Sequence, residues 1–233
     1  MFEPKNTSRT ITVERREASV LSTNSVLRNT YLLLSMTLLF SALMAFIAMA
    51  THATLPQGIG GALMFLAGSF GLLFLTQALR NSAWGILAVF GFTGFMGYFL
   101  GPLLSLYLST YSNGAAIIMN ALGTTGLIFF GLSAYVLTTR KDFSFMTGFL
   151  TAGAIALLVA MLFGIFFHSS TFQLVLSTLF ALFTSAMILW QTSAIVHGGE
   201  RNYISATITL YLQIYNLFTS LLQLFAAFSG NDD

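Results

Sequence analysis

Residues 84 to 108 read WGILAVFGFTGFMGYFLGPLLSLYL and contain no Asp, Glu, Lys or Arg. A run of this length and composition is what an α-helix needs to cross the roughly 30 Å hydrocarbon core of a bilayer. Six more apolar stretches of similar length flank it, and every charged residue falls in the tails or in the gaps between stretches. The predicted spans cover residues 30–50, 58–79, 84–108, 115–137, 145–167, 172–190 and 205–228.

The composition also indicates a membrane protein. Hydrophobic residues make up 56% of the chain and charged residues only 7%, against roughly 25% charged in an ordinary soluble domain. The net charge is only +2, and no basic patch with interleaved aromatic residues suggests nucleic-acid binding. We therefore predict an all-α membrane protein, a seven-transmembrane-helix bundle. Residues 1–25 form a polar tail, residues 26–229 the membrane domain, and residues 230–233 a short outer tail.

The basic residues predict the orientation of the bundle, because Lys and Arg in short loops stay on the cytoplasmic side. Basic residues precede the first span and follow the second, fourth and sixth spans, whereas the other three loops contain none. The amino terminus is therefore expected in the cytoplasm and the carboxyl terminus in the periplasm. The tail of residues 1–25 is expected to be mobile or weakly amphipathic, acting as a topology signal or, alternatively, as a docking handle for a cytoplasmic partner.

The third span carries Gly91, Gly94, Gly97 and Gly101 at intervals of three or four residues. This spacing predicts one helix face on which another backbone can approach closely, for packing or, alternatively, as the hinge of a gate. Pro102 follows directly and is expected to kink the helix.

Amide side chains mark the last two spans. Gln191 lies near the inner end of the sixth span, and Gln213, Asn216 and Gln223 lie within the seventh. Amides in lipid need hydrogen-bond partners, so these side chains are expected to face the interior of the bundle. Interhelical hydrogen bonding and a permeation pathway both remain open for them.

Catalytic and metal sites find little support. The chain has no Cys, which excludes thiolate nucleophiles, disulfides and Cys metal sites. Residues 131–134, GLSA, faintly resemble the serine motif of intramembrane proteases, but all three His lie at span ends or in loops, so none can act as the base. His197 and Glu200 flank a Gly-Gly pair, which favours a turn over a metal site. We predict no enzymatic activity, no cofactor and no metal site.

Several motifs resemble those of a known family. Residues 197–203, HGGERNY, and 210–218, LYLQIYNLF, resemble the carboxyl-terminal signature of the Bax inhibitor membrane family. Residues 97–102, GYFLGP, and 134–142, AYVLTTRKD, resemble its central motifs, especially those of the bacterial YccA branch. The resemblance extends from Val26 to about Phe228. The signature residues are His197, Gly198, Gly199, Glu200, Asn202 and Tyr203.

This resemblance implies a bundle in which one central helix is surrounded by the others. For some bacterial members it also implies a pH-sensitive calcium leak, with two aspartates that share a proton and a basic residue that pairs with one of them. By motif position the aspartates correspond to Gln191 and Gln213, and the basic residue to Arg80. Because amides do not titrate, a pH gate of that kind is expected to be absent and calcium binding there to be weaker. Straight helices would separate the two Gln by about 15 Å in depth, so only the resemblance suggests that they are close.

The resemblance leaves two functions open. Members of the YccA branch are associated with FtsH, a membrane-anchored AAA protease whose degradation of membrane proteins they restrain. This favours a non-enzymatic regulatory protein of the bacterial inner membrane, with an FtsH-type protease as its partner. The alternative is a cation leak channel for Ca²⁺, with Gln191, Gln213, Arg80 and Asn216 as its polar core. The lipid bilayer is a partner in either case, and nucleic acid is not.

Overall fold

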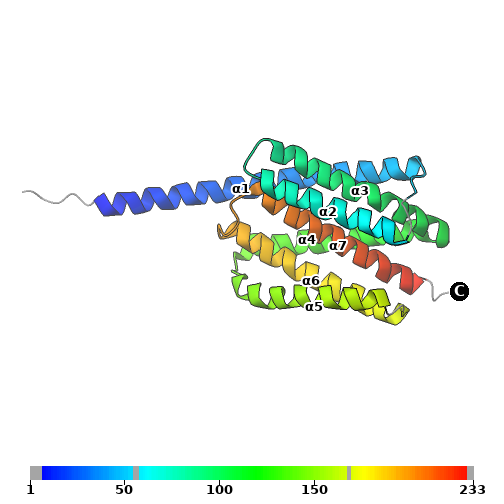
Figure 1. Ribbon diagram of the computed structural model, residues 1–233. Coiled ribbons are helices and arrows are strands. Elements are labelled where there is room, and N and C mark those ends of the chain that lie inside the picture. Colours follow the sequence, from blue (N-terminus) through cyan, green and yellow to red (C-terminus); the bar gives the residue numbers. More distant parts are fainter. Residues whose placement is uncertain (1–6, 55–57, 167–168, 230–233) are drawn as a thin grey trace, which may run out of the picture.

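The computed structural model describes residues 7–54, 58–166 and 169–229. Within these residues each of seven α-helices contains a portion long and apolar enough to cross a membrane, which confirms the predicted all-α architecture (Figure 1). The elements, in chain order, are α1 (Thr7–Ala50), α2 (Gly58–Leu79), α3 (Trp84–Thr110), α4 (Gly114–Thr139), the 3₁₀-helix η1 (Ser144–Met146), α5 (Thr147–Phe166), α6 (Ser170–Val196) and α7 (Tyr203–Ser229).

Two helices extend more than five residues beyond one end of their predicted spans. The membrane-length portion of α1 is Ser25–Ala50, but the helix begins at Thr7 and projects beyond the bundle (Figure 1). No Gly or Pro interrupts α1, so nothing in its sequence breaks a helix where the membrane-length portion begins. The backbone of residues 7–24 is therefore helical. Likewise, α6 continues past Trp190 to Val196, which places the candidate residue Gln191 inside a helix.

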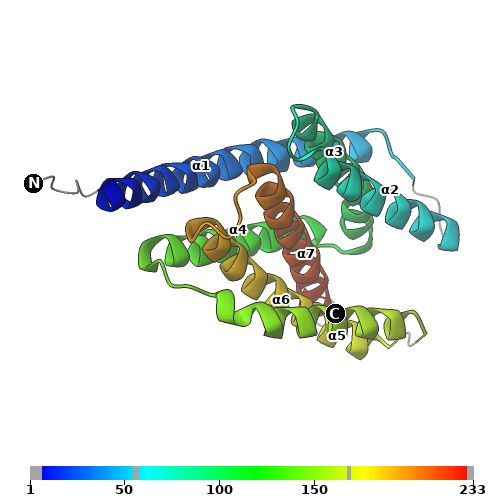
Figure 2. The ribbon, with the colours of Figure 1, turned by 60° about the vertical axis from the view of Figure 1, so that its left-hand side comes forward.

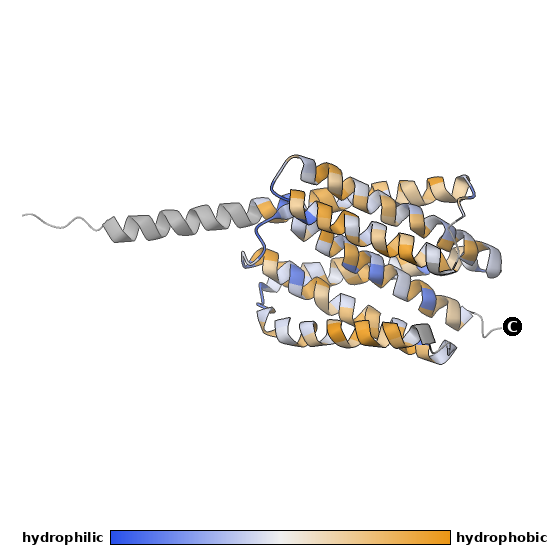
Figure 3. Cartoon of the chain, in the orientation of Figure 1, coloured by the Kyte–Doolittle hydropathy of each residue, from blue (hydrophilic) through white to orange (hydrophobic). Residues whose placement is uncertain are grey.

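The loops after α2, α4 and α6 lie together at one end of the bundle. We call it the basic end because it carries Arg80, Arg140, Lys141 and Arg201. Side-chain hydrogen bonds join these three loops directly. α7 begins at the basic end and finishes at the opposite end (Figures 1 and 2). Hydrophilic residues are concentrated in these loops, whereas the helices are mainly hydrophobic (Figure 3).

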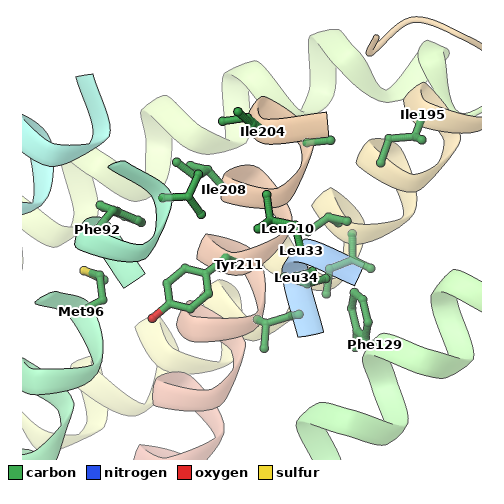
Figure 4. Close-up of a cluster of buried hydrophobic side chains, with 14 of the residues drawn as sticks. Leu33, Leu34, Phe92, Met96, Phe129, Ile195, Ile204, Ile208, Leu210 and Tyr211 are labelled. Atoms are coloured by element: carbon green, nitrogen blue, oxygen red, sulfur yellow. The ribbon is translucent and has the colours of Figure 1, made fainter. Parts of the chain in front are cut away.

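α7 occupies the centre of the bundle, where it packs against α1, α2, α3, α4 and α6. The largest buried hydrophobic cluster forms around it (Figure 4). Four helices supply labelled side chains to the α7 residues Ile204, Ile208, Leu210 and Tyr211, namely Leu33 and Leu34 of α1, Phe92 and Met96 of α3, Phe129 of α4 and Ile195 of α6.

The peripheral helices α2 and α5 expose large apolar side chains. Phe70 and Phe74 of α2 are 53% and 70% exposed, and Phe149 and Phe163 of α5 are 72% and 56% exposed. A water-soluble protein rarely exposes so many large apolar groups. These faces are suited to contact with lipid.

α1 and α3 approach each other through small residues. A Cβ atom on Gly97 would lie 2.2 Å from the carbonyl oxygen of Ser41, and one on Gly101 would lie 2.6 Å from that of Ala45. Both distances are shorter than van der Waals contact allows, so only glycine permits this approach. Close backbone packing of this kind is a main source of helix association in membranes.

Gly94 also lies on the α1 side of α3, where its Cβ would meet the Phe40 ring at 2.7 Å. Gly91 differs from the other three, because nothing lies within 4 Å of a Cβ atom built there. Three residues turn a helix by about 300°, so Gly91 lies about 60° around α3 from Gly94 and about 120° from Gly97. The α3 helix itself continues through Pro102 to Thr110.

Candidate functional site

The signature residues between α6 and α7 build a tight turn. α6 ends at Val196, and Gly198 has a φ of +74°, a left-handed conformation that glycine adopts without steric cost. The N–H groups of Gly199 and Glu200 then donate to the carbonyl oxygen of Ala194 at 2.8 and 3.0 Å. These bonds satisfy a carbonyl left free at the end of α6. The Gly-Gly pair therefore makes a helix stop.

Asn202 caps α7 and attaches it to the loop between α2 and α3. Its Oδ1 accepts hydrogen bonds from the N–H groups of Ile204 and Ser205, at 3.0 and 3.1 Å, as an N-cap residue does. Its Nδ2 donates to the carbonyl oxygen of Arg80 at 3.0 Å and to Oδ1 of Asn81 at 2.8 Å. One side chain thus fixes the start of the central helix to a neighbouring loop.

A second set of bonds, which we call the His197 junction, joins the end of α6 to residues 140–143 of the loop after α4. His197 Nε2 lies 3.0 Å from the carbonyl oxygen of Arg140, and Nδ1 lies 2.9 Å from that of Ser193. The hydroxyl of Ser193 accepts from the N–H of Phe143 at 3.0 Å. The same hydroxyl lies 3.3 Å from the carbonyl oxygen of Lys141 and 3.3 Å from His197 Nδ1.

Two charged side chains beside this junction, Asp142 and Lys141, interact with residues close to them in the sequence. The N–H of Ser144 donates to Asp142 Oδ1 at 2.8 Å, and this bond, with a smaller contribution from the nearby His197, lowers the pKa of the Asp142 carboxyl below its ordinary value. The Lys141 ammonium lies 5.6 Å from the centre of the Tyr135 ring, and its interaction with Tyr135 raises the pKa of Lys141.

The two tryptophans have different environments, although both fall at predicted span ends. Trp84 begins α3 and is 67% exposed, as expected for a residue at the membrane interface. Trp190 is half-buried, and its indole N–H donates to the hydroxyl of Thr147 at 2.9 Å. Trp190 therefore links α6 to the first residue of α5.

The structure places the predicted polar core on two packed helices and one loop. Gln191 of α6 and Gln213 of α7 are 3% and 8% exposed, and Asn216 is half-buried. Arg80 is exposed in the loop after α2. Within the described residues, no hydrogen bond joins one of these four side chains to another. Because α6 reaches Val196, the difference in depth between the two Gln falls to about 8 Å, half of the value expected from the shorter predicted span.

Five buried polar atoms within the described residues have no hydrogen-bond partner, and we call the groups that carry them the polar layer: Thr30 Oγ1, Tyr31 OH, Ser133 Oγ, Gln191 Nε2 and Thr192 Oγ1. The α4 and α6 members lie four to six residues before the ends of their helices, about 6 to 9 Å from the basic end. The α1 members lie at the same level, because the hydroxyl of Thr207, near the start of α7, donates to the Thr30 carbonyl oxygen at 3.3 Å.

The polar layer has the chemistry of a neutral site. Its hydroxyls can donate or accept hydrogen bonds, and Gln191 Nε2 can only donate. Buried groups of this kind ordinarily bind water or another polar partner, because leaving them unpaired is costly. Calcium sites draw their affinity from carboxylates, and the layer contains none. Its groups are therefore suited to hydrogen bonding with water or another neutral polar partner.

The described residues assemble neither a metal cluster nor an activated nucleophile. No group of three His, Asp or Glu side chains comes together among them. Ser133, the serine of the GLSA segment, has no hydrogen-bond partner that could act as its base.

Tyr211 is a buried polar residue to which the sequence alone assigns no role. Its hydroxyl lies 2.7 Å from Ser41 Oγ of α1 and donates to the Thr93 carbonyl oxygen of α3 at 3.3 Å. The hydroxyl of a tyrosine inside an apolar span needs a hydrogen-bond partner. The position of Tyr211 within such a span is therefore the sequence signal that could have identified it. Further along α7, Gln223 accepts a hydrogen bond from Ser177 of α6. α7 therefore makes polar contacts along most of its length.

Comparisons with known proteins agree with the motifs. The family described as "Inhibitor of apoptosis-promoting Bax1" matches residues 23–230. An uncharacterized protein of Pseudomonas aeruginosa is 55% identical over 219 residues, which cover 94% of each chain. The "Modulator of FtsH protease YccA" of Escherichia coli K12 is 48% identical over 216 residues, covering 93% of this chain and 96% of the relative. An "Uncharacterized membrane protein" of Vibrio cholerae is 48% identical over 225 residues, covering 97% of each.

These matches extend over all seven membrane-length helices and include the loops of the basic end. The chain belongs to the Bax inhibitor family and is similar over nearly its whole length to E. coli YccA.

Proposed function

We propose that this protein is a regulatory protein of the bacterial inner membrane that modulates a membrane-anchored AAA protease of the FtsH type. The observation that carries the proposal is the 48% identity, over 93% of the chain, to an E. coli protein named as a modulator of FtsH protease. A relative from a second E. coli strain, also 48% identical over 216 residues, is named "Inner membrane protein YccA". The name of the first relative also supports a regulatory rather than an enzymatic role.

The basic end supports a specific orientation. Lys and Arg in short loops are retained in the cytoplasm, so we place the basic end and the start of α1 on the cytoplasmic side, and the end of α7 on the periplasmic side. The portion of α1 before Ser25 would extend about 27 Å at 1.5 Å per residue. This segment is the proposed handle for a cytoplasmic partner.

The test measures how fast E. coli FtsH degrades a membrane substrate when this protein is reconstituted in the same vesicles. The full chain is expected to slow degradation, and deletion of residues Met1 to Ser22 is expected to abolish this effect while leaving the bundle inserted. Removal of the last four residues, Gly230 to Asp233, serves as the control and should change nothing. Unchanged inhibition by the amino-terminally truncated protein would refute the role of the tail, and no inhibition by the full chain would refute the function.

The polar layer favours a second candidate, a cation leak, because it gives the bundle interior hydroxyl and amide groups without partners. Gln191 and Gln213 occupy the positions that correspond to the two aspartates of some family members. Because amides do not titrate, this counts against pH-gated conduction. Calcium flux into proteoliposomes at about pH 6 and pH 8 tests it, comparing this chain with the Gln191→Asp/Gln213→Asp double variant. Flux in both, pH-dependent only in the variant, would support an ungated channel. A silent parent with a conducting variant would support the protease regulator.

A further inference from the structure

Both ring nitrogens of His197 face backbone carbonyl oxygens, those of Ser193 and Arg140. A carbonyl oxygen only accepts hydrogen bonds, so each nitrogen must carry a proton to bond its partner. Neutral imidazole has one N–H, whereas imidazolium has two. Only the protonated ring can make both bonds at once.

Protonated His197 leaves the Ser193 hydroxyl proton free for the loop. In this state Nε2–H donates to the Arg140 carbonyl and Nδ1–H to the Ser193 carbonyl. The Ser193 hydroxyl donates to the Lys141 carbonyl at 3.3 Å and accepts from the Phe143 N–H at 3.0 Å. Three hydrogen bonds then join the end of α6 to residues 140–143.

Neutral His197 changes one of these bonds. If Nε2 keeps its proton and its bond to Arg140, Nδ1 becomes an acceptor with its lone pair directed at the Ser193 carbonyl oxygen. The group that can donate to it is the Ser193 hydroxyl, 3.3 Å away. That hydroxyl has a single proton, so it must leave the Lys141 carbonyl. Two hydrogen bonds remain between α6 and the loop.

We propose that His197 is a pH-dependent latch, whose protonation tightens the attachment of the loop between α4 and α5 to the end of α6. Histidine is the side chain whose charge ordinarily changes near neutral pH. The latch does not involve Gln191 or Gln213, and it goes beyond the proposed function.

The loops after α4 and α6 carry the charged groups nearest to the latch in the sequence. Asp142 lies near enough to interact electrostatically with His197, and Glu200, in the next turn, carries the same negative charge. Arg140, Lys141 and Arg201 carry the opposite charge. The packed residues of η1, the first turns of α5 and α7 and the last turn of α4 carry no charge.

The attachment matters because α5 has few other contacts. Within the described residues α5 packs only against α6 and the adjoining η1. The loop of the His197 junction leads into η1, and the Trp190 bond to Thr147 holds the first residue of α5. Tightening the loop would therefore restrain the position of α5 against α6.

Hydrogen exchange of residues 140–146 tests the latch, with rates at pH 6 and pH 8 corrected for the intrinsic pH dependence of exchange. One hydrogen bond more in acid should slow corrected exchange by about threefold to tenfold at pH 6 in the unmodified protein. Residues 109–114, at the opposite end of the bundle, serve as the internal control and should show no difference.

Two variants separate the latch from simple titration. His197→Gln cannot titrate, so the difference between pH 6 and pH 8 should vanish. Ser193→Ala keeps the titrating ring but lacks the hydroxyl that changes partner, so the difference should vanish there too. Equal protection of the unmodified protein at the two pH values would overturn the proposal, as would a difference that survives in Ser193→Ala.

If Ser193→Ala does not fold, the indole ¹H–¹⁵N resonance of Trp190 provides the second measurement. The chain has two Trp, so a Trp84→Phe variant assigns the signal. The Trp190 resonance should move between pH 6 and pH 8 in the unmodified protein and stay fixed in His197→Gln. A resonance that does not move in the unmodified protein would also overturn the latch.

Discussion

Replacing Gly97 with alanine is expected to push α1 away from α3. The new Cβ would lie 2.2 Å from the Ser41 carbonyl oxygen and 2.7 Å from its hydroxyl oxygen. The closest atom belongs to the backbone, so a side-chain rotation cannot relieve the clash. One of the two helices must move by about 1 Å to restore ordinary van der Waals separation.

The cost can be estimated from two unfavourable terms and one favourable term. Overpacking a well-filled interior typically costs about 1 to 3 kcal/mol, and here the movement also lengthens the bond of 2.7 Å between Ser41 and Tyr211, worth about 1 kcal/mol. Alanine in place of glycine in a helix returns about 1 kcal/mol. We expect Gly97→Ala to lower the free energy of unfolding by about 2 kcal/mol.

Thermal unfolding in a mild detergent measures this effect, and Gly91→Ala is the matched control. It makes the same chemical change in the same helix, but nothing lies within 4 Å of its Cβ. It should therefore leave the midpoint unchanged or raise it slightly, whereas Gly97→Ala should lower it by about 5 °C. Equal midpoints for the two variants would refute the close approach of α1 and α3.

Three further predictions concern polar contacts. Tyr211→Phe should lower the free energy of unfolding by about 1 kcal/mol, whereas Tyr215→Phe, whose hydroxyl makes no hydrogen bond among the described residues, should have a smaller effect in the same assay. Asn202→Ala should cost about 1 to 2 kcal/mol, because it removes the cap of α7 and the attachment to the next loop. The lowered pKa of Asp142 means that its bond to Ser144 stabilises the fold above the ordinary carboxyl pKa and is lost as the pH falls through the folded value. Asp142→Asn should therefore flatten the dependence of the unfolding midpoint on pH below about 4, and an unchanged acid slope would contradict this.

Hydropathy predicts the membrane-length helices well because most of them face lipid on one side and apolar side chains on the other. It misplaces the end of α6 for a physical reason. Gln191, Thr192 and Ser193 are polar in sequence, yet they are 3%, 0% and 1% exposed because neighbouring helices and the loop after α4 cover them. A polar residue shielded by protein has the same hydropathy as one in a loop, so sequence alone places the boundary too early.

The glycine pattern shows a similar limit. Intervals of three and four residues predict a shared helix face, and Gly94, Gly97 and Gly101 do face α1. Successive steps of three residues rotate steadily around the helix, however, and so carry Gly91 away from the contact. The spacing predicts close packing against another helix, but it does not show which of the four glycines lies outside the contact.

The polar layer is even harder to predict from the sequence. Ser and Thr hydroxyls in membrane helices usually bond to a carbonyl of their own helix, as Thr125 does to Ala121 at 2.7 Å. Ser133, two turns further along α4, makes no such bond. The two residues look alike in the sequence, and only their surroundings distinguish a locally satisfied hydroxyl from an unpartnered one.

The most direct test of the proposed function is the rate at which E. coli FtsH degrades a membrane substrate in vesicles with and without this protein at equal FtsH content. We expect degradation to become slower as the amount of this protein increases. We expect the rate to return to that of FtsH alone when residues 1–22 are removed. Degradation at the same rate with and without the full chain would contradict it.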